Sequence, residues 1–291
     1  MDLTLFDRVT GILGVVRTRR AAGALAATAL AAAASGTAAR KRKHRCLAPT
    51  SDLQVVVNGT APGATVRLCA GVFPGLLDVD KDLKLLGAGA GKTFLSGEQK
   101  GTVLTVAAGH TVVVSGVTIT GGEINGSSAA GGVDNSGTLT LAGCAVRGNF
   151  AYYGAGAMNR AGARLTLDAT TVAGNQGVHA GGGVYNEGDL VVRNGSVIGS
   201  TQASDGNTAR FGAGIANNGT GTGTFAKGTK VTGNAIDNGE GTGTPDGAGI
   251  YNSVADGVTL ATTSIVTGNT RFGSPNNCGG PEPVAKCLEE A

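Results

Sequence analysis

Short apolar runs alternate with glycine-rich corners along most of this chain. Five hexapeptides each end in asparagine, and they read "AGGVDN" (130–135), "GAGAMN" (154–159), "GGGVYN" (181–186), "GAGIAN" (212–217) and "GAGIYN" (247–252). The asparagines are 24, 27, 31 and 35 residues apart. An eight-residue block follows each hexapeptide, as in "LTLAGCAV" (139–146), and an earlier "VVVSGVTI" (112–119) has the same form. Each unit therefore predicts about three short strands separated by Gly or Asn corners.

Repeats built from strands alone predict a parallel β-helix. One coil cannot cover its own apolar face, whereas coils stacked about 4.8 Å apart let each strand bond to the strands above and below. Strand alternation places Ile250 and Asn252 on one face and Tyr251 on the other. We therefore expect an inward asparagine ladder whose amides bond to the corner backbone and to one another. Its predicted members are Asn135, Asn159, Asn186, Asn217 and Asn252.

A second short motif follows the eight-residue blocks. A Gly-Asn pair occurs at 148–149, 174–175, 233–234 and 268–269, where the third copy reads Gly199-Ser200. Nearly all variation in repeat length falls between the block and the next ladder asparagine. The longer inserts, 200–211 and 235–246, are therefore expected to emerge on one side of the helix.

The repeats resemble those of the right-handed parallel β-helix, pectin-lyase-like group. Units of the form "VTGN…GAGIYN" also resemble the repeats of polymorphic outer-membrane and adhesin-like passengers, and residues 65–97 resemble the first coils of such chains. The resemblance covers about residues 52–270 and implies an all-β solenoid of about eight to nine coils with three short parallel sheets. The same scaffold serves lyases, hydrolases, esterases and non-enzymatic binders, so the resemblance leaves the activity open.

Composition and charge separate a basic head from a mildly acidic body. Residues 1–45 hold nine Arg or Lys and two Asp, which leaves a net charge of −4 for residues 46–291. Nucleic acid is therefore not expected as a partner of the body. Residues 1–39 contain "TRRAAGALAATALAAAASGTAA", the layout of a signal peptide of Sec or twin-arginine type. Its apolar run is too short to span a bilayer, and residues 40–51 read as a basic, flexible leader.

Five cysteines fit an oxidising compartment. Cys278 and Cys287 bracket a short loop within the C-terminal cap predicted for 271–291, and we expect them to pair. Cys46 and Cys69 are expected to tie down the start of the helix. Cys144 lies inside a repeat and is interpreted as a small buried apolar residue.

One outward column is the candidate binding surface. Asp134, Tyr185 and Tyr251 alternate with the ladder asparagines, and Glu187 lies beside them. Tyrosine faces flanked by polar groups suit sugar stacking, and the two inserts are expected to wall a groove there. The alternative is a solubilising surface with tolerated loop insertions.

Catalytic and metal candidates are sparse. A lyase needs a base near a sugar C5 and a cation beside the uronate, for which the candidate pairs are Arg160 with Glu187 and Asp205 with Arg210. His179 is interpreted as a polar corner residue, because the companion motifs of polygalacturonase-type hydrolases are missing from the sequence. No cofactor is expected. Ca²⁺ remains the alternative at Asp78, Asp80 and Asp82, although side chains on a strand face lie about 6.6 Å apart.

The sequence thus predicts an exported, monomeric β-helix scaffold that binds polysaccharide or a cell-envelope component without catalysis. The first alternative is a polysaccharide lyase or glycoside hydrolase with a divergent site. The second is a structural repeat protein that self-assembles through its end coils.

Overall fold

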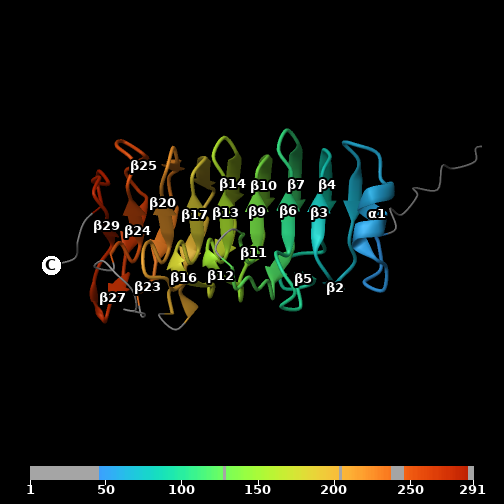
Figure 1. Ribbon diagram of the computed structural model, residues 1–291, viewed down its shortest axis with the longest axis horizontal. Coiled ribbons are helices and arrows are strands. Elements are labelled where there is room, and N and C mark those ends of the chain that lie inside the picture. Colours follow the sequence, from blue (N-terminus) through green and yellow to red (C-terminus); the bar gives the residue numbers. More distant parts are fainter. Residues whose placement is uncertain (1–45, 127–128, 203–204, 237–245, 288–291) are drawn as a thin grey trace, which may run out of the picture. The chain divides into compact units, whose positions relative to one another are not determined.

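The described chain is built from three parallel sheets of eight strands each. The computed structural model describes residues 46–126, 129–202, 205–236 and 246–287. The predicted signal peptide, and the leader as far as residue 45, lie outside the described residues. Each coil gives one strand to each sheet (Figure 1), so there are eight coils, which we number from the N-terminal end.

The sheets are defined by the following strands. The first sheet contains β1 (Thr65–Arg67), β4 (Leu83–Leu86), β7 (Thr111–Ser115), β10 (Thr138–Ala142), β14 (Arg164–Asp168), β18 (Asp189–Arg193), β21 (Thr222–Phe225) and β25 (Val258–Leu260). The second contains β2 (Gly71–Pro74), β5 (Thr93–Ser96), β8 (Thr118–Thr120), β11 (Ala145–Val146), β15 (Thr171–Val172), β19 (Val197–Gly199), β22 (Lys230–Thr232) and β26 (Ile265–Thr267). The third contains β3 (Leu77–Val79), β6 (Leu104–Val106), β9 (Val133–Asn135), β13 (Ala157–Asn159), β17 (Val184–Asn186), β20 (Ile215–Asn217), β24 (Ile250–Asn252) and β29 (Cys278–Gly279).

A fourth, shorter column lies in the chain between the second and third sheets. We call it the side sheet, and it comprises β12 (Phe150–Tyr153), β16 (Gln176–Ala180) and isolated bridges at Thr208 and Phe211. Towards the C-terminus a bridge between Thr208 and Ala235 connects this column to a three-stranded sheet of β23 (Ala235–Ile236), β27 (Thr270–Arg271) and β28 (Ser274–Pro275). The side sheet adds a fourth wall to the middle coils, and the repeat pattern did not predict it.

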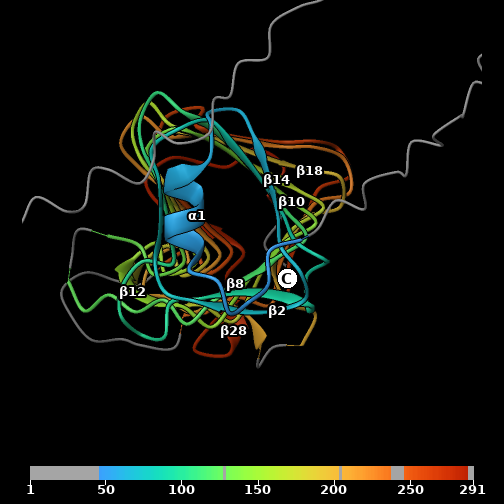
Figure 2. The ribbon, with the colours of Figure 1, turned by 90° about the vertical axis from the view of Figure 1, so that its right-hand side faces the viewer.

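The coils wind in a right-handed sense. Figure 2 looks along the helix from its N-terminal end, with the chain receding from the viewer. It passes clockwise from the first sheet (β10, β14) through the second (β2, β8) to β12. All pairings between successive coils in the three main sheets are parallel. The predicted right-handed parallel β-helix is confirmed.

Strand alternation fills the interior with aliphatic columns. In the first sheet Leu139, Leu165 and Leu190 are paired in register and fully buried. Two residues further along the same strands, Leu141 and Leu167 pair in register and form a second column of the same kind. Identical side chains therefore stack along the axis, and each coil covers the apolar edge of the next.

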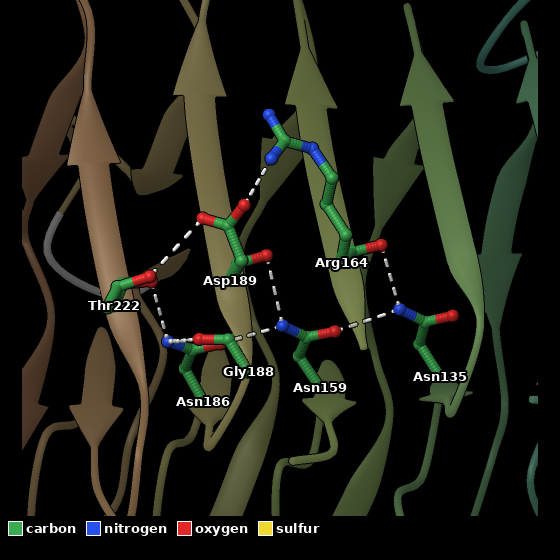
Figure 3. A network of polar contacts seen from close by, with 7 residues as sticks. All are labelled: Asn135, Asn159, Arg164, Asn186, Gly188, Asp189 and Thr222. Atoms are coloured by element: carbon green, nitrogen blue, oxygen red, sulfur yellow. Dashed lines mark hydrogen bonds and ion pairs between the residues drawn. The ribbon is translucent and has the colours of Figure 1, made fainter. Parts of the chain in front are cut away.

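The predicted asparagine ladder is present at the corner between the third and first sheets. Side-chain hydrogen bonds join Asn135, Asn159, Asn186, Asn217 and Asn252 in sequence, with Nδ2–Oδ1 distances of 2.8 to 2.9 Å. Each amide also bonds the corner backbone, as Asn186 Nδ2 does with the carbonyls of Gly188 and Thr222 (Figure 3). These amides are buried, so the ladder satisfies groups that water cannot reach.

A second ladder runs along the corner after the second sheet. It joins Asn149, Asn175, Asn207, Asn234, Asn269 and Asn277 at 2.8 to 3.2 Å. In coil 6 the ladder residue is Asn207, so Gly206-Asn207 is the counterpart of the Gly-Asn pairs, not Gly199-Ser200. Residues 200–205 are the extra segment, and the chain rejoins the coil at Gly206.

Two glycines of the hexapeptide have different roles. The first adopts a positive φ, as at Gly181 (66°) and Gly247 (63°), which L side chains rarely adopt. The third has an ordinary φ but no room. A Cβ at Gly183 would lie 2.5 Å from the Gly214 carbonyl oxygen and 2.9 Å from Asn207 Nδ2. Stacked coils and the second ladder therefore exclude a side chain at this position.

Both ends of the β-helix are covered. Helix α1 (Leu53–Gly59) lies across the mouth of coil 1 (Figure 2), and its Leu53 and Val57 complete the core. The side-chain amide of Gln54 bonds both backbone groups of Asp78 at 2.7 and 3.0 Å, as a neighbouring strand would. The β-helix therefore begins at β1 rather than at residue 52, because the preceding apolar residues form this cap.

The C-terminal end is closed by residues 280–287. Val284 is buried in the core, and Lys286 Nζ bonds the carbonyl of Leu260 at 3.3 Å. Strand β29 extends the third sheet to residue 279, beyond the limit of 270 expected from the repeats. The described residues thus cover both end coils, and the self-assembling alternative stays a prediction.

Both predicted disulfides are formed, Cys46–Cys69 and Cys278–Cys287. Cys144 is free and buried, and burial raises the pKa of its thiol. It packs as a small apolar core residue, as predicted. The described residues contain no helix long and apolar enough to cross a membrane.

Candidate functional site

A chain of aromatic rings follows the outer surface of coils 4 to 7. Tyr153 and His179 lie 5.1 Å apart between ring centroids, His179 and Phe211 5.3 Å, and Phe211 and Tyr251 5.3 Å. Tyr185 joins the row through Tyr153 at 5.1 Å. The interplanar angles of 48 to 60° show tilted or edge contacts, which aromatic rings prefer to face-to-face stacking.

Two neighbouring sheets position these rings. The third sheet holds the predicted outward column in register, with Met158 opposite Tyr185, then Ala216 and Tyr251. The side sheet brings Tyr153, His179 and Phe211 alongside, since Tyr153 pairs with Ala180 and Ala180 with Phe211. The small Ala216 separates the two tyrosines of its column.

The rings line a groove of about 490 Å³, which we call the aromatic groove. Its lining comprises Tyr153, His179, Ala180, Tyr185, Glu187, Phe211, Asn218, Gly219 and Tyr251. The five rings are half-buried, so each supports its neighbours and keeps part of its surface open. Tyr185, Tyr251 and Glu187 were predicted for such a site, and the structure brings these three together.

Local electrostatics favour the protonated form of two of the groove's phenols, Tyr185 and Tyr153. Burial, and then the Glu187 carboxylate and Tyr153, raise the pKa of Tyr185, while a hydrogen bond with Asn218 acts in the opposite direction. Burial, followed by Tyr152, raises the pKa of Tyr153. Both hydroxyls therefore remain hydrogen-bond donors at neutral pH.

His179 is a strand residue of β16, not the corner residue expected from the sequence. Burial, and then the charge of Arg210, lower the pKa of its imidazole, so the ring is neutral near pH 7. Its Nδ1 is buried and has no hydrogen-bond partner within the described part of the chain. Tyr152 stacks on the ring at 5.4 Å, with an interplanar angle of 16°.

Asp134 and Arg160 form an ion pair beside the groove. Arg160 Nε lies 2.6 Å from Asp134 Oδ1, and Nη2 lies 2.5 Å from Oδ2. This hydrogen bonding is the main reason that the pKa of Arg160 is raised. Asp134 is only 7% exposed and does not line the groove, so its predicted binding role has no counterpart in this geometry.

The second candidate pair, Asp205 and Arg210, does not line the aromatic groove. Arg210 is 3% exposed, with its guanidinium carbon 5.3 Å from the centre of the Phe211 ring. Asp205 is exposed at the rim of a broad groove of about 950 Å³ over the second sheet, which Arg147 also lines. Ser200, Thr201 and Asp205 thus border that groove and not the aromatic one. Residues 237–245 of the other insert lie outside the described residues.

The three aspartates considered for Ca²⁺ do not converge. Asp82 accepts the backbone N–H of Thr111 at 2.7 Å and lies 3.9 Å from His110 Nδ1. The described residues contain no cluster of three His, Cys, Asp or Glu side chains that could hold a metal ion.

Tyr153, His179 and Phe211 were missed as groove residues, although the sequence carries a signal. Each lies one or two positions before the first glycine of a hexapeptide, in "YYGAGAMN", "VHAGGGVYN" and "RFGAGIAN". An aromatic residue before three consecutive hexapeptides marks a column. Assigning that column to the surface beside Tyr185 required the side sheet, which has no constant spacing along the chain.

The fold and groove together define a right-handed parallel β-helix with an aromatic surface groove. No protein-family model matches the chain, and no curated protein matches it in sequence. Among solved structures, an alginate lyase from Paenibacillus sp. is similar with a TM-score of 0.40 and 13% identity, over 81% of this chain and 96% of that one. A pectin methylesterase from Aspergillus niger is similar with a TM-score of 0.41 and 14% identity, over 82% and 85%. The fold assignment rests on the chain's own sheets and register.

Proposed function

We propose that this protein is exported and binds polysaccharide through the aromatic groove. The observation that carries the proposal is the row of five rings across four coils. Exposed ring surface beside a few polar groups is the composition of a ligand site, because apolar sugar faces can lie on the rings while hydroxyls bond to the polar groups. Here Glu187 and Asn218 are those polar groups. Coils about 4.8 Å apart repeat the rings at close to the length of one pyranose, which suits a linear chain.

Export is supported by two features. The sequence of residues 1–39 has the layout of a signal peptide, and the body carries two disulfides. Disulfides persist in oxidising compartments, where a polysaccharide ligand would also be met.

The proposal is tested by measuring binding of the purified full chain to a panel of neutral, acidic and amino-sugar oligosaccharides by calorimetry. Tyr185→Ala and Tyr251→Ala should each weaken binding about tenfold, since an aromatic contact contributes roughly 1 kcal/mol beyond its buried area. Phe272→Ala is the control, because Phe272 is 58% exposed and does not line the groove. Equal effects of all three variants would contradict the proposal.

A polysaccharide lyase is the second candidate, and His179 is the observation that favours it. A neutral imidazole in ring contact with Tyr153 supplies, with the tyrosine hydroxyl, the base and acid types that an elimination needs. A glycosidase is less well supported, because its two-carboxylate mechanism has only Glu187 among the described lining residues. Release of unsaturated uronate that is lost in His179→Gln would establish the lyase. If the oligosaccharides stay intact after long incubation, with and without Ca²⁺, the lyase is rejected and the proposal of a non-catalytic binding protein is kept.

A further inference from the structure

We propose that the aromatic groove selects polysaccharide that carries protonated amino sugars. This inference rests on the proposed glycan binding and names the class of sugar. The juxtaposition that carries it is a single carboxylate set among five aromatic rings.

The charge of the groove comes from Glu187. Among the described residues that line it, Glu187 is the only side chain with a formal charge, and it is half-buried. It lies next to Tyr185 in the groove, close enough for its charge to act on the tyrosine hydroxyl. A partly desolvated carboxylate favours a cation and opposes a second carboxylate, so a uronate is a poor occupant.

The aromatic rings act in the same direction. A ring face carries negative potential, and an ammonium group over it gains about 0.5 to 2 kcal/mol. Tyr153, Tyr185 and Tyr251 contribute such faces around the groove. A sugar that carries an ammonium group can therefore lay its apolar face on one ring while its charge meets Glu187 and another ring.

The neighbouring arginines do not reverse this preference. Arg160 lies close to Glu187 in the fold, but its Nε and Nη2 donate to the Asp134 carboxylate and it does not line the groove. Arg210 is buried against Phe211 and does not line the groove, so the charge that a ligand contacts there is that of Glu187. The body as a whole, residues 46–291, carries −4, which adds weak long-range attraction for a cationic polymer.

The test compares three oligosaccharides of equal length: chito-oligosaccharides with free amines, the same chains fully N-acetylated, and oligouronates. Binding to the full chain is measured at about pH 6, where alkylammonium groups are charged, and at low salt. We expect the free-amine chains to bind about tenfold more tightly than the N-acetylated chains, and the oligouronates to bind least. The preference should shrink as salt is added.

Glu187→Gln separates charge from shape. It should bring the free-amine and N-acetylated chains to within about twofold of each other, with little change in affinity for the N-acetylated chains. Glu123→Gln is the matched control, because it removes the same charge from a half-buried residue that is bridged to Phe150 and does not line the groove. That variant should keep the tenfold preference.

Two results would overturn the inference, and they are distinguishable. If N-acetylated chains or oligouronates bind as tightly as free-amine chains, and Tyr185→Ala weakens both, glycan binding stands and the amino-sugar preference is wrong. If none of the three binds and the tyrosine variants behave as wild type, the proposed function fails and this inference fails with it.

Discussion

At the residue scale, the asparagine ladders help to fix how the coils stack, because each buried amide needs hydrogen-bond partners on the adjacent coils. Each interior amide in the first ladder has a partner above, a partner below and the corner backbone, as Asn186 shows with Asn159, Asn217 and Gly188. A buried amide left without these partners would cost roughly 1–3 kcal/mol. Corners of different length can therefore stack only where an asparagine reaches the ladder position.

Asn186→Ala should lower the free energy of unfolding by about 2–3 kcal/mol, because it removes the hydrogen bonds that Asn186 makes with the side chains of Asn159 and Asn217 and with the Thr222 carbonyl. Urea unfolding followed by circular dichroism measures the change. Asn125→Ala is the control: Asn125 is exposed and its side chain donates to Glu123 two residues away, so a change within about 0.5 kcal/mol is expected there. Equal losses in the two variants would mean that the ladder is not a major source of stability.

The first ladder was predictable because its asparagines close near-identical hexapeptides. The second ladder was predictable only in part. The Gly-Asn pairs were recognised, but the extra segment 200–205 places the coil 6 member at Asn207 instead of the expected position. A sequence pattern depends on regular spacing, whereas the ladder requires only that an asparagine side chain lies at the corner of each coil. An insertion therefore disturbs the spacing in the sequence although the ladder position in the structure is still occupied.

At the element scale, the side sheet determines the candidate site. β16 places His179 between the rings of Tyr152 and Tyr153 on one side and Phe211 on the other. Its register with β12 contains an irregularity between Ala151 and Tyr153. The eight-residue blocks predicted the three main sheets because their alternation is regular. No comparable alternation marks the side sheet, so half of the groove was missed.

His179 should make stability depend on pH. Its folded pKa is lowered by burial and by Arg210, so the unfolded chain binds the proton more tightly. The free energy of unfolding should therefore be greatest above the ordinary histidine pKa of about 6.5 and fall as the pH drops through that value towards the folded pKa. Tyr152, Tyr153, Phe211 and Arg210 surround the His179 ring.

Urea midpoints measured between about pH 7.5 and 5.5 test this dependence. His179→Phe keeps a ring in the cluster and should flatten the profile. His110→Gln removes the other described histidine, which lies beside Asp82 outside the aromatic groove, and the dependence assigned to His179 should persist in that variant. A slope that persists in His179→Phe would assign the titration to another group.

At the scale of the whole molecule, the β-helix behaves as a stack in which each coil contacts its neighbours and the ends are closed separately. At the start, α1 and Cys46–Cys69 cover coil 1, and at the other end Val284 and Cys278–Cys287 cover coil 8. The structure of the interior coils was predictable because the sequence of one unit recurs in the next. The helical cap was not predictable, since its apolar residues cover one end of the β-helix and their pattern occurs only once in the sequence.

Opening one end should therefore loosen that end first. In the double variant Cys278→Ser/Cys287→Ser, loss of the cross-link should destabilise the cap by about 2–3 kcal/mol. Amide exchange should then accelerate in β24, β25 and β29 and stay slow in β7, β10 and β14, because coupling passes only between adjacent coils. Cys46→Ser/Cys69→Ser is the matched control, with faster exchange expected in β1 and β4 instead. If either variant raised exchange evenly along all eight coils, the stack would unfold as one cooperative unit, and the end caps would then stabilise every coil equally, including those that carry the aromatic groove.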